Sequence, residues 1–129
     1  MLRLSDLVAT SARVAATRAR REKVAHLAGL LSRLEPAEVP IAVAFLSGDL
    51  RQGRVGLGPA AVRGAWLESP AAEPTLGLGE VDAAFERIAA AAGRGATGEK
   101  AALLAALLAR ATAAEGDFLT RLVLGELRQ

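Results

Sequence analysis

The residues best suited to bind a ligand lie at the ends of two similar segments, each of which closes with Gly, an acid, Leu, Arg and Gln. Arginine offers a planar fork of donors to phosphate oxygens, and glycine lets a backbone approach a ligand closely. Free backbone N–H groups in the glycine-rich loop after the first segment, or at the next helix start, can join them. The candidate anion-binding residues are Arg51, Gln52, Gly53, Arg54, Gly56, Gly58, Arg121, Gly125, Arg128 and Gln129.

These two ends belong to an internal repeat. Residues 22–52 align without a gap with residues 99–129 at an offset of 77, and fourteen of the thirty-one pairs are identical. A chain this rich in Ala and Leu gives roughly four identities by chance. Eleven of the fourteen identities are not Ala, so low complexity does not explain the match. The sequence therefore predicts a duplicated unit, with residues 68–79 as a linker between the copies.

Each copy has the periodicity of a helical hairpin. The first elements carry apolar residues every three to four positions: Val24, Leu27, Leu31 and Leu34 in one copy, and Ala101, Leu104, Leu108 and Ala111 in the other. Residues 41–46 fit a strand or a helix, but Phe118, Leu122 and their neighbours in the second copy indicate a helix. The interiors of the repeats, residues 27–34 and 104–108, are predicted to form the core.

Further helices are expected around the two hairpins. Glu35-Pro-Ala-Glu and Thr112-Ala-Ala-Glu have the spacing of helix starts. The remaining helices are predicted at about residues 5–16, with Ser5 as the cap, 59–67 and 80–92. The sum is an all-α domain of about seven helices that occupies residues 1–129, with approximate two-fold symmetry and no sheet.

Charge is distributed unevenly although the net charge is only +2. Residues 1–33 carry seven Arg or Lys against two acids, whereas residues 68–99 carry two against six. The amino-terminal third is therefore a candidate surface for a polyanion, and a solvated charged face is the alternative. No apolar stretch is long enough for a membrane span, and the first residues lack the pattern of a signal peptide.

No other group of residues forms a catalytic or metal site in the sequence. The chain has no Cys and one His, which excludes thiolate zinc sites and disulfides. Gly93-Arg-Gly-Ala-Thr-Gly matches a dinucleotide-binding pattern but follows a helix rather than a strand, so a helix stop followed by a Thr97 cap is predicted. Asp82 and Glu86 are interpreted as solvated acids, and Trp66 is assigned to the core.

The carboxyl-terminal repeat resembles a known family. Residues 118–129, Phe-Leu-Thr-Arg-Leu-Val-Leu-Gly-Glu-Leu-Arg-Gln, preceded by Glu99-Lys-Ala-Ala-Leu-Leu, are similar to the amino-terminal DNA-binding domain of ATP-dependent DNA ligases, and residues 45–58 strengthen the similarity. The resemblance covers nearly the whole chain. It implies an all-helical domain with pseudo-two-fold symmetry that docks in the minor groove on both sides of a nick and helps the catalytic core encircle the duplex. Glu126 occupies a position that is often basic in the family, which weakens any contact assigned there.

The resemblance also implies where catalysis lies. The family's adenylated lysine belongs to a Lys-x-Asp-Gly motif, whereas Lys23 is followed by Val-Ala-His and Lys100 by Ala-Ala-Leu. We therefore expect a non-catalytic DNA-binding domain without its own cofactor or metal, and a parent ligase that uses ATP and Mg²⁺ in a catalytic domain absent from this chain.

The expected partners are nicked double-stranded DNA and the other domains of the same ligase, in replication and repair. The expected state is a cytoplasmic monomer with no membrane contact. The alternative is a helical-repeat protein-interaction module, in which the Arg-Gln ends would be incidental.

Overall fold

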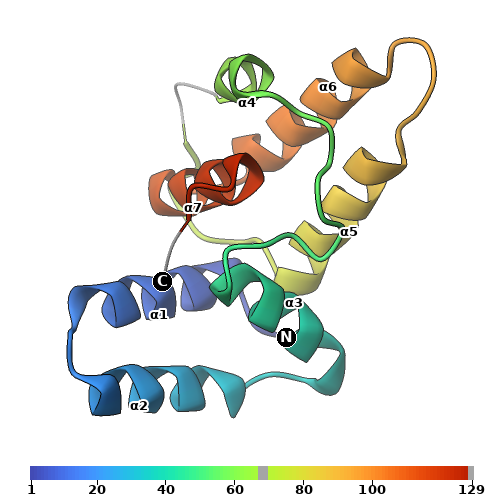
Figure 1. The fold of residues 1–129 in the computed structure, drawn as a ribbon. Coiled ribbons are helices and arrows are strands. Elements are labelled where there is room, and N and C mark those ends of the chain that lie inside the picture. The colour runs from blue at the N-terminus through green and yellow to red at the C-terminus, as the bar shows by residue number, and fades with distance from the viewer. Residues whose placement is uncertain (67–69, 128–129) are drawn as a thin grey trace.

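A computed structural model describes residues 1–66 and 70–127, and these ranges are all-helical (Figure 1). They contain seven α-helices, one 3₁₀ turn and no strand, so the predicted all-α class and the predicted number of helices are confirmed. The elements are α1 (Leu4–Ala16), α2 (Arg20–Leu31), η1 (Pro36–Glu38), α3 (Val39–Leu46), α4 (Pro59–Ala65), α5 (Leu78–Ala90), α6 (Ala96–Ala109) and α7 (Ala113–Leu124). No helix of the described ranges is long and apolar enough to cross a membrane.

Neighbours along the chain are not always neighbours in space (Figure 1). Helix α1 packs against α2, α3 and α7, and α5 packs against α3 and α6. Helix α4 crosses to the other end of the molecule and packs against α6 and α7. The core between these helices includes Phe45 of α3 and Phe118 of α7, whose ring centroids are 6.4 Å apart. Burial of these large apolar side chains is the main force that holds the helices together.

Two short extended segments join the amino terminus to the segment that leads into α5. The N–H of Leu4 donates to the carbonyl of Leu76 at 2.9 Å, and the N–H of Leu78 donates to the carbonyl of Leu2 at 2.9 Å. These bonds flank an isolated antiparallel bridge between Arg3 and Gly77. The entries to α1 and α5 are thereby fixed side by side.

Most helix starts follow the sequence signals, but two predicted caps are wrong. The Thr112 hydroxyl accepts from the N–H of Glu115 at 3.2 Å, as its spacing predicts. Ser5 lies inside α1, because the carboxylate of Asp6 accepts from the N–H of Arg3 at 3.2 Å and starts the helix earlier. Thr97 lies inside α6, which begins directly after Gly95. In α1, the Asp6 carboxylate takes the hydrogen-bonding role at the helix start that was predicted for the hydroxyl of Ser5.

The second element of the first repeat is helical, which confirms the interpretation taken from the second repeat. It consists of η1 followed by α3, whereas the aligned part of the second repeat is the single helix α7. Pro40 lies near the start of α3, where its missing N–H costs no helical bond. Whether the two hairpins are copies of one unit stays a prediction at this point.

The predicted core of the first repeat is partly wrong. Leu30 of α2 is only 2% exposed, but Leu31 is 42% and Val24 57% exposed. The aligned Leu108 of α6 is 4% exposed, because α6 packs against both α5 and α4 whereas the principal neighbour of α2 is α1 alone. Trp66 is also more exposed than predicted, at 38%. Its ring lies against Gly116 of α7, where an added Cβ would collide with it.

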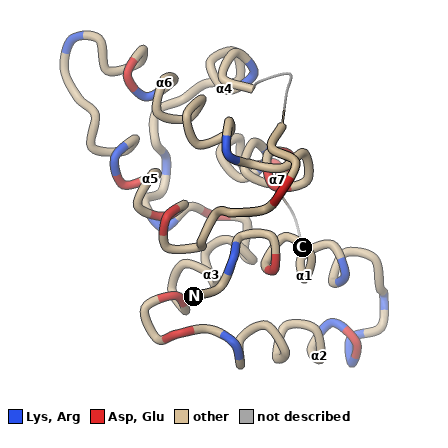
Figure 2. Tube along the Cα trace, turned by 180° about the vertical axis from the view of Figure 1, so that it is seen from behind, with Lys and Arg blue, Asp and Glu red and all other residues tan. Residues whose placement is uncertain are grey.

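Lys and Arg gather around the turn that joins α1 to α2 (Figure 2). The exposed side chains of this basic turn are Arg13, Arg18, Arg20 and Arg21. The excess of basic residues that the sequence places in residues 1–33 is therefore concentrated at one corner of the fold.

Candidate nucleic-acid interface

The two Gly-acid-Leu ends adopt the same turn. Gly48 follows α3 with φ of 84°, and Gly125 follows α7 with φ of 70°, a conformation in which L side chains are strained. The N–H of Asp49 donates to the carbonyl of Ala44 at 2.9 Å, and the aligned N–H of Glu126 donates to the carbonyl of Arg121 at 2.8 Å. Each helix therefore ends by turning its chain back across its own last turn.

These two turns lie against each other. A Cβ added to Gly48 would be 2.6 Å from the carbonyl oxygen of Leu127. An open groove of about 820 Å³ runs beside them and is lined from both ends, by Gly48, Asp49, Leu50, Arg51, Gly53, Arg54, Val55, Gly56, Leu57, Pro59, Leu122, Val123, Leu124 and Gly125. The fold thus brings residues 77 positions apart in the sequence to one surface.

The groove collects half of the candidate site residues. Those that line it are Arg51, Gly53, Arg54, Gly56 and Gly125. Gly58 lies directly before α4, and Arg121 is exposed on α7, where its nearest carboxylate, that of Asp117, is 4.0 Å away. Gln52 turns toward α5 instead of the groove. Arg128 and Gln129 lie outside the described residues.

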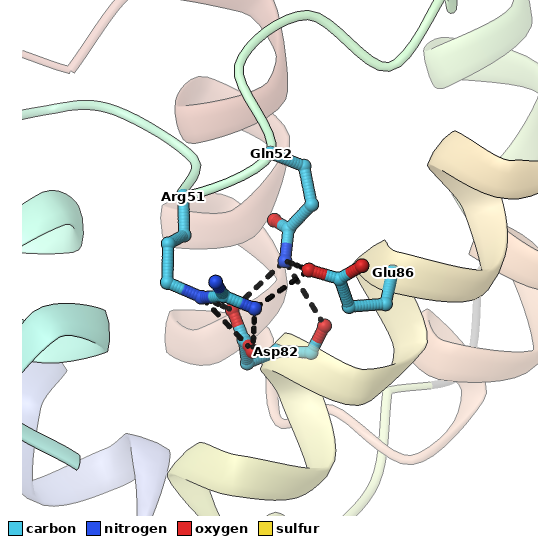
Figure 3. A network of polar contacts seen from close by, with 4 residues as sticks. All are labelled: Arg51, Gln52, Asp82 and Glu86. Atoms are coloured by element: carbon cyan, nitrogen blue, oxygen red, sulfur yellow. Dashed lines mark hydrogen bonds and ion pairs between the residues drawn. The ribbon is translucent and has the colours of Figure 1, made fainter. Parts of the chain in front are cut away.

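Arg51 and Gln52 are bound to two acids of α5 (Figure 3). Arg51 Nη2 donates to Asp82 Oδ2 at 2.9 Å and to Glu86 Oε1 at 2.6 Å, and Arg51 Nε donates to Asp82 Oδ1 at 3.1 Å. Gln52 Nε2 donates to Asp82 Oδ1 at 3.0 Å and to Glu86 Oε1 at 2.8 Å. The side chain of Asp82 is only 11% exposed. The interpretation of Asp82 as a solvated acid is therefore wrong.

This network fixes the loop that follows α3. Hydrogen bonding to the Asp82 carboxylate, and then the charges of Asp82 and Glu86, raise the pKa of Arg51 above its ordinary value. A phosphate group that approached Arg51 would have to compete with two carboxylates already in place. Arg51 and Gln52 thus anchor the loop to α5, a role that the sequence analysis did not assign to them.

Lys100 of α6 holds the same loop from another side. Its Nζ donates to the carbonyl oxygen of Val55 at 2.6 Å, and a Cβ added to Gly56 would be 2.8 Å from Nζ. The backbone near Gly56 is therefore close-packed against the lysine. Arg51 is thus paired with the acids of α5, and Lys100 binds the backbone of the loop. In the described contacts, exposed Arg54 is the cation of the loop that is not paired with an acid of α5.

Comparison with known proteins assigns the chain to a family. The family described as "DNA ligase N terminus" matches residues 60–129, more than half of the chain. The chain belongs to the DNA ligase N-terminal family. A probable DNA ligase of Anaeromyxobacter sp. strain Fw109-5 is 58% identical over 130 residues, which cover 99% of this chain and 25% of that protein.

Further relatives of this ligase domain have the same extent. A probable DNA ligase of Sorangium cellulosum strain So ce56 is 58% identical over 127 residues, with 98% of this chain and 24% of that protein covered. One of Saccharopolyspora erythraea is 55% identical over 129 residues, with 100% and 25% covered. The chain therefore spans about a quarter of the length of these relatives. No solved structure matches it.

Sequence reasoning on this ligase domain missed two residues of the site, Asp82 and Lys100. Asp82 and Glu86 are four residues apart, and this spacing places both carboxylates on one helix face, where a cation could bind. That signal was present in the sequence. Which arginine would bind the pair depends on the packing of α3 against α5, and no local pattern reports this packing.

Proposed function

We propose that this chain is the non-catalytic DNA-binding domain of an ATP-dependent DNA ligase. It holds nicked duplex DNA through the phosphate backbone and the minor groove, and it positions the nick for the ligase's other domains. The observation that carries the proposal is the groove in which the two Gly-acid-Leu ends meet, in a chain of the ligase N-terminal family. ATP and Mg²⁺ are assigned to the part of the ligase outside this chain.

The candidate site residues divide into two roles under this proposal. Arg51 and Gln52 position the loop through α5, whereas Arg54 and Arg121 contact phosphate oxygens. The ion pair of Arg121 with Asp117 is loose at 4.0 Å and highly exposed, so a phosphate displaces the carboxylate at little cost. Gly53, Gly58 and Gly125, where an added Cβ would meet nothing within 4 Å, let the backbone approach the strand, whereas the space beside Gly56 is filled by Lys100.

We also propose that the domain is an internal duplication with a pseudo-two-fold axis, and that its unit is larger than a hairpin. Helix α1 aligns with α5 at an offset of 74, with five identities among thirteen pairs. The offset differs by three from that of the hairpins, so an ungapped comparison does not detect it. Each unit then has three aligned helices, α1 to α3 and α5 to α7.

Matched contacts support the duplication. Arg33 pairs with Asp6 at 3.5 Å, and the aligned Arg110 pairs with Glu80 at 3.0 Å. The hydrogen bonds Leu4 to Leu76 and Leu78 to Leu2 are also exchanged when the units are exchanged. Such symmetry suits duplex DNA, because the two sugar-phosphate backbones of a duplex are themselves related by two-fold axes.

Titration of fluorescent nicked duplex with the chain tests DNA binding. We expect log Kd to rise with log salt concentration by about 0.9 for each phosphate contact. Arg54→Ala and Arg121→Ala should each weaken binding and reduce that slope by about one. Arg94→Ala, at an exposed arginine in the turn before α6, is the matched control and should change neither quantity.

Three outcomes of this titration would count against the proposal. They are the absence of binding at low salt, binding without salt dependence, and equal affinity of the Arg54 and Arg121 variants with the wild type. The absence of binding would favour the protein-interaction module, for which these arginines are incidental.

A further inference from the structure

Helices α2 and α3 of the first unit each present apolar side chains to solvent. Val24 and Leu31 of α2 are 57% and 42% exposed, and Val39 and Val43 of α3 are 39% and 50% exposed. Val24, Leu27 and Leu31 recur at helical spacing, so they form one stripe along α2. We name Val24, Leu27, Leu31, Val39 and Val43 the α2/α3 face. An exposed apolar surface of this kind marks an interaction site.

The aligned surface of the second unit is covered. Leu104 and Leu108 of α6, which align with Leu27 and Leu31, are 0% and 4% exposed. Helix α4 packs against both α6 and α7, with Val62 and Ala65 buried at 0% and 4% exposure. The difference between the two units is therefore the presence of α4, which belongs to the first unit but covers the second.

The other side of α2 is covered by α1, just as the other side of α6 is covered by α5. Leu30 is 2% exposed in α2, which packs against α1, and the aligned Leu107 is 6% exposed in α6, which packs against α5. The two first helices thus sit on equivalent neighbours. What α2 lacks is the second neighbour that α6 has in α4.

We propose that the α2/α3 face is the docking site for a short apolar helix with the chemistry of α4, supplied in the full-length ligase by polypeptide outside this chain. The relatives are about four times as long and contain such additional polypeptide. The inference rests on the duplication proposed above. Since α4, the fourth helix of the first unit, covers the second unit, the duplication implies that a fourth helix of the second unit covers the first. The occupant begins with proline, like α4, and buries small aliphatic side chains.

Two aligned residues narrow the chemistry of the occupant. Val39 takes the place of Gly116, against which the Trp66 ring lies, so the residue that ends the incoming helix is smaller than tryptophan. Lys23 of α2 aligns with Lys100, whose Nζ binds the carbonyl of Val55 ahead of α4. Lys23 is accordingly expected to donate a hydrogen bond to a backbone carbonyl of the segment that precedes the occupant.

Cysteine accessibility tests the docking site, because the chain has no cysteine of its own. Single variants Val24→Cys and Val43→Cys are made in this chain, and again in a chain extended by the segment that follows the matched region in the Anaeromyxobacter ligase. Docking should slow maleimide labelling of both thiols by about tenfold or more in the extended chain. Ala25→Cys, about 100° around α2 from Val24, is exposed and should label equally fast in both chains.

Equal labelling rates at Val24→Cys and Val43→Cys in the two chains would overturn the proposal. Protection that appears in the short chain only as its concentration rises would overturn it too, since a second copy would then cover the face. If a cysteine variant does not fold, amide hydrogen exchange of α2 and α3 in the unsubstituted chains gives the same comparison. No DNA is present in these measurements, so failure of DNA binding would leave their result unaffected.

Discussion

At the scale of single residues, the main result is that Arg51, an arginine whose side chain could bind phosphate, is already bound to carboxylates of the protein itself. Arg51 donates hydrogen bonds to Asp82 and Glu86 of α5. Both acids lie in residues 68–99, which the sequence identifies only as an acidic segment. The reverse holds for Arg54, which is exposed beside the groove without such acids in its described contacts. Residue type alone could not separate these two arginines, because their difference comes from the packing of α3 on α5.

Replacement of Arg51 by alanine is expected to destabilise the fold more than it weakens DNA binding. The change leaves the largely buried Asp82 carboxylate without its principal charged partner, and such groups are costly when unpaired. Urea unfolding should show a lower midpoint for Arg51→Ala than for the wild type. If the variant is as stable as the wild type but loses DNA affinity, the anchoring role is wrong and a phosphate contact is indicated.

A second prediction at this scale concerns acid stability. Burial tends to raise the pKa of Glu38, but hydrogen bonds from the N–H groups of Glu35 and Leu2 outweigh it, and the pKa lies below its ordinary value of 4.5. The bond to the Gly77 N–H and the Arg110 guanidinium lower the pKa of Glu80 likewise. A group with a depressed folded pKa stabilises the fold above its unfolded pKa and loses that contribution as pH falls through the folded value.

The free energy of unfolding should therefore decrease as pH falls below about 4.5, the ordinary pKa of these groups. Glu38→Gln should lower stability at neutral pH and make the decline at acid pH shallower. Urea titrations at several pH values between neutral and strongly acidic check both expectations. An unchanged acid slope in Glu38→Gln would contradict the assignment to Glu38.

At the scale of elements, helix type and order were predictable, but helix surroundings were not. The second hairpin allowed the helix at residues 41–46 to be inferred, because Phe118 and Leu122 lack the ambiguity of the first copy. The same repeat misled the assignment of Leu31 to the core, since aligned residues were taken to have equal burial. Periodicity reports which face of a helix is apolar, but not whether another helix is present to cover it.

The turns after α3 and α7 give a matched pair of glycine substitutions. Gly48→Ala and Gly125→Ala both place a side chain at a positive φ, which costs roughly 1–2 kcal/mol. Gly48→Ala should cost more, because its Cβ also meets the carbonyl of Leu127 at 2.6 Å, whereas nothing lies within 4 Å of Gly125. Urea unfolding of the two variants checks the order. Equal destabilisation would mean that the two turns do not press against each other.

At the scale of the whole molecule, the two proposed units share contacts, but the sequence supplies acids that can anchor the loop for only one of them. The positions of α1 that align with Asp82 and Glu86 are Val8 and Ala12, which carry no charge. An arginine that corresponds to Arg51 in the second unit therefore finds no aligned carboxylates in the first. Under the pseudo-symmetry we propose, Arg51 and Arg128 therefore have equivalent places in the sequence but different expected roles.

We accordingly predict that Arg128→Ala weakens binding to nicked duplex and reduces the salt slope by about one, without a change in stability. Arg51→Ala, in contrast, should act mainly on stability. Anisotropy titrations and urea unfolding on the same pair of variants separate the two roles. If Arg128→Ala destabilises the chain as strongly as Arg51→Ala, the difference between the units is not the one that the α1 sequence indicates.

The position of α4 also determines the order in which the chain can complete its structure during synthesis. Val62 and Ala65 leave the ribosome well before residues 96–124, which form the helices that bury them. Arg51 likewise waits for Asp82, thirty-one residues later. The amino-terminal half therefore emerges with an uncovered helix and an unpaired charge, and the packing of α4 is completed only when α6 and α7 have followed it out of the ribosome.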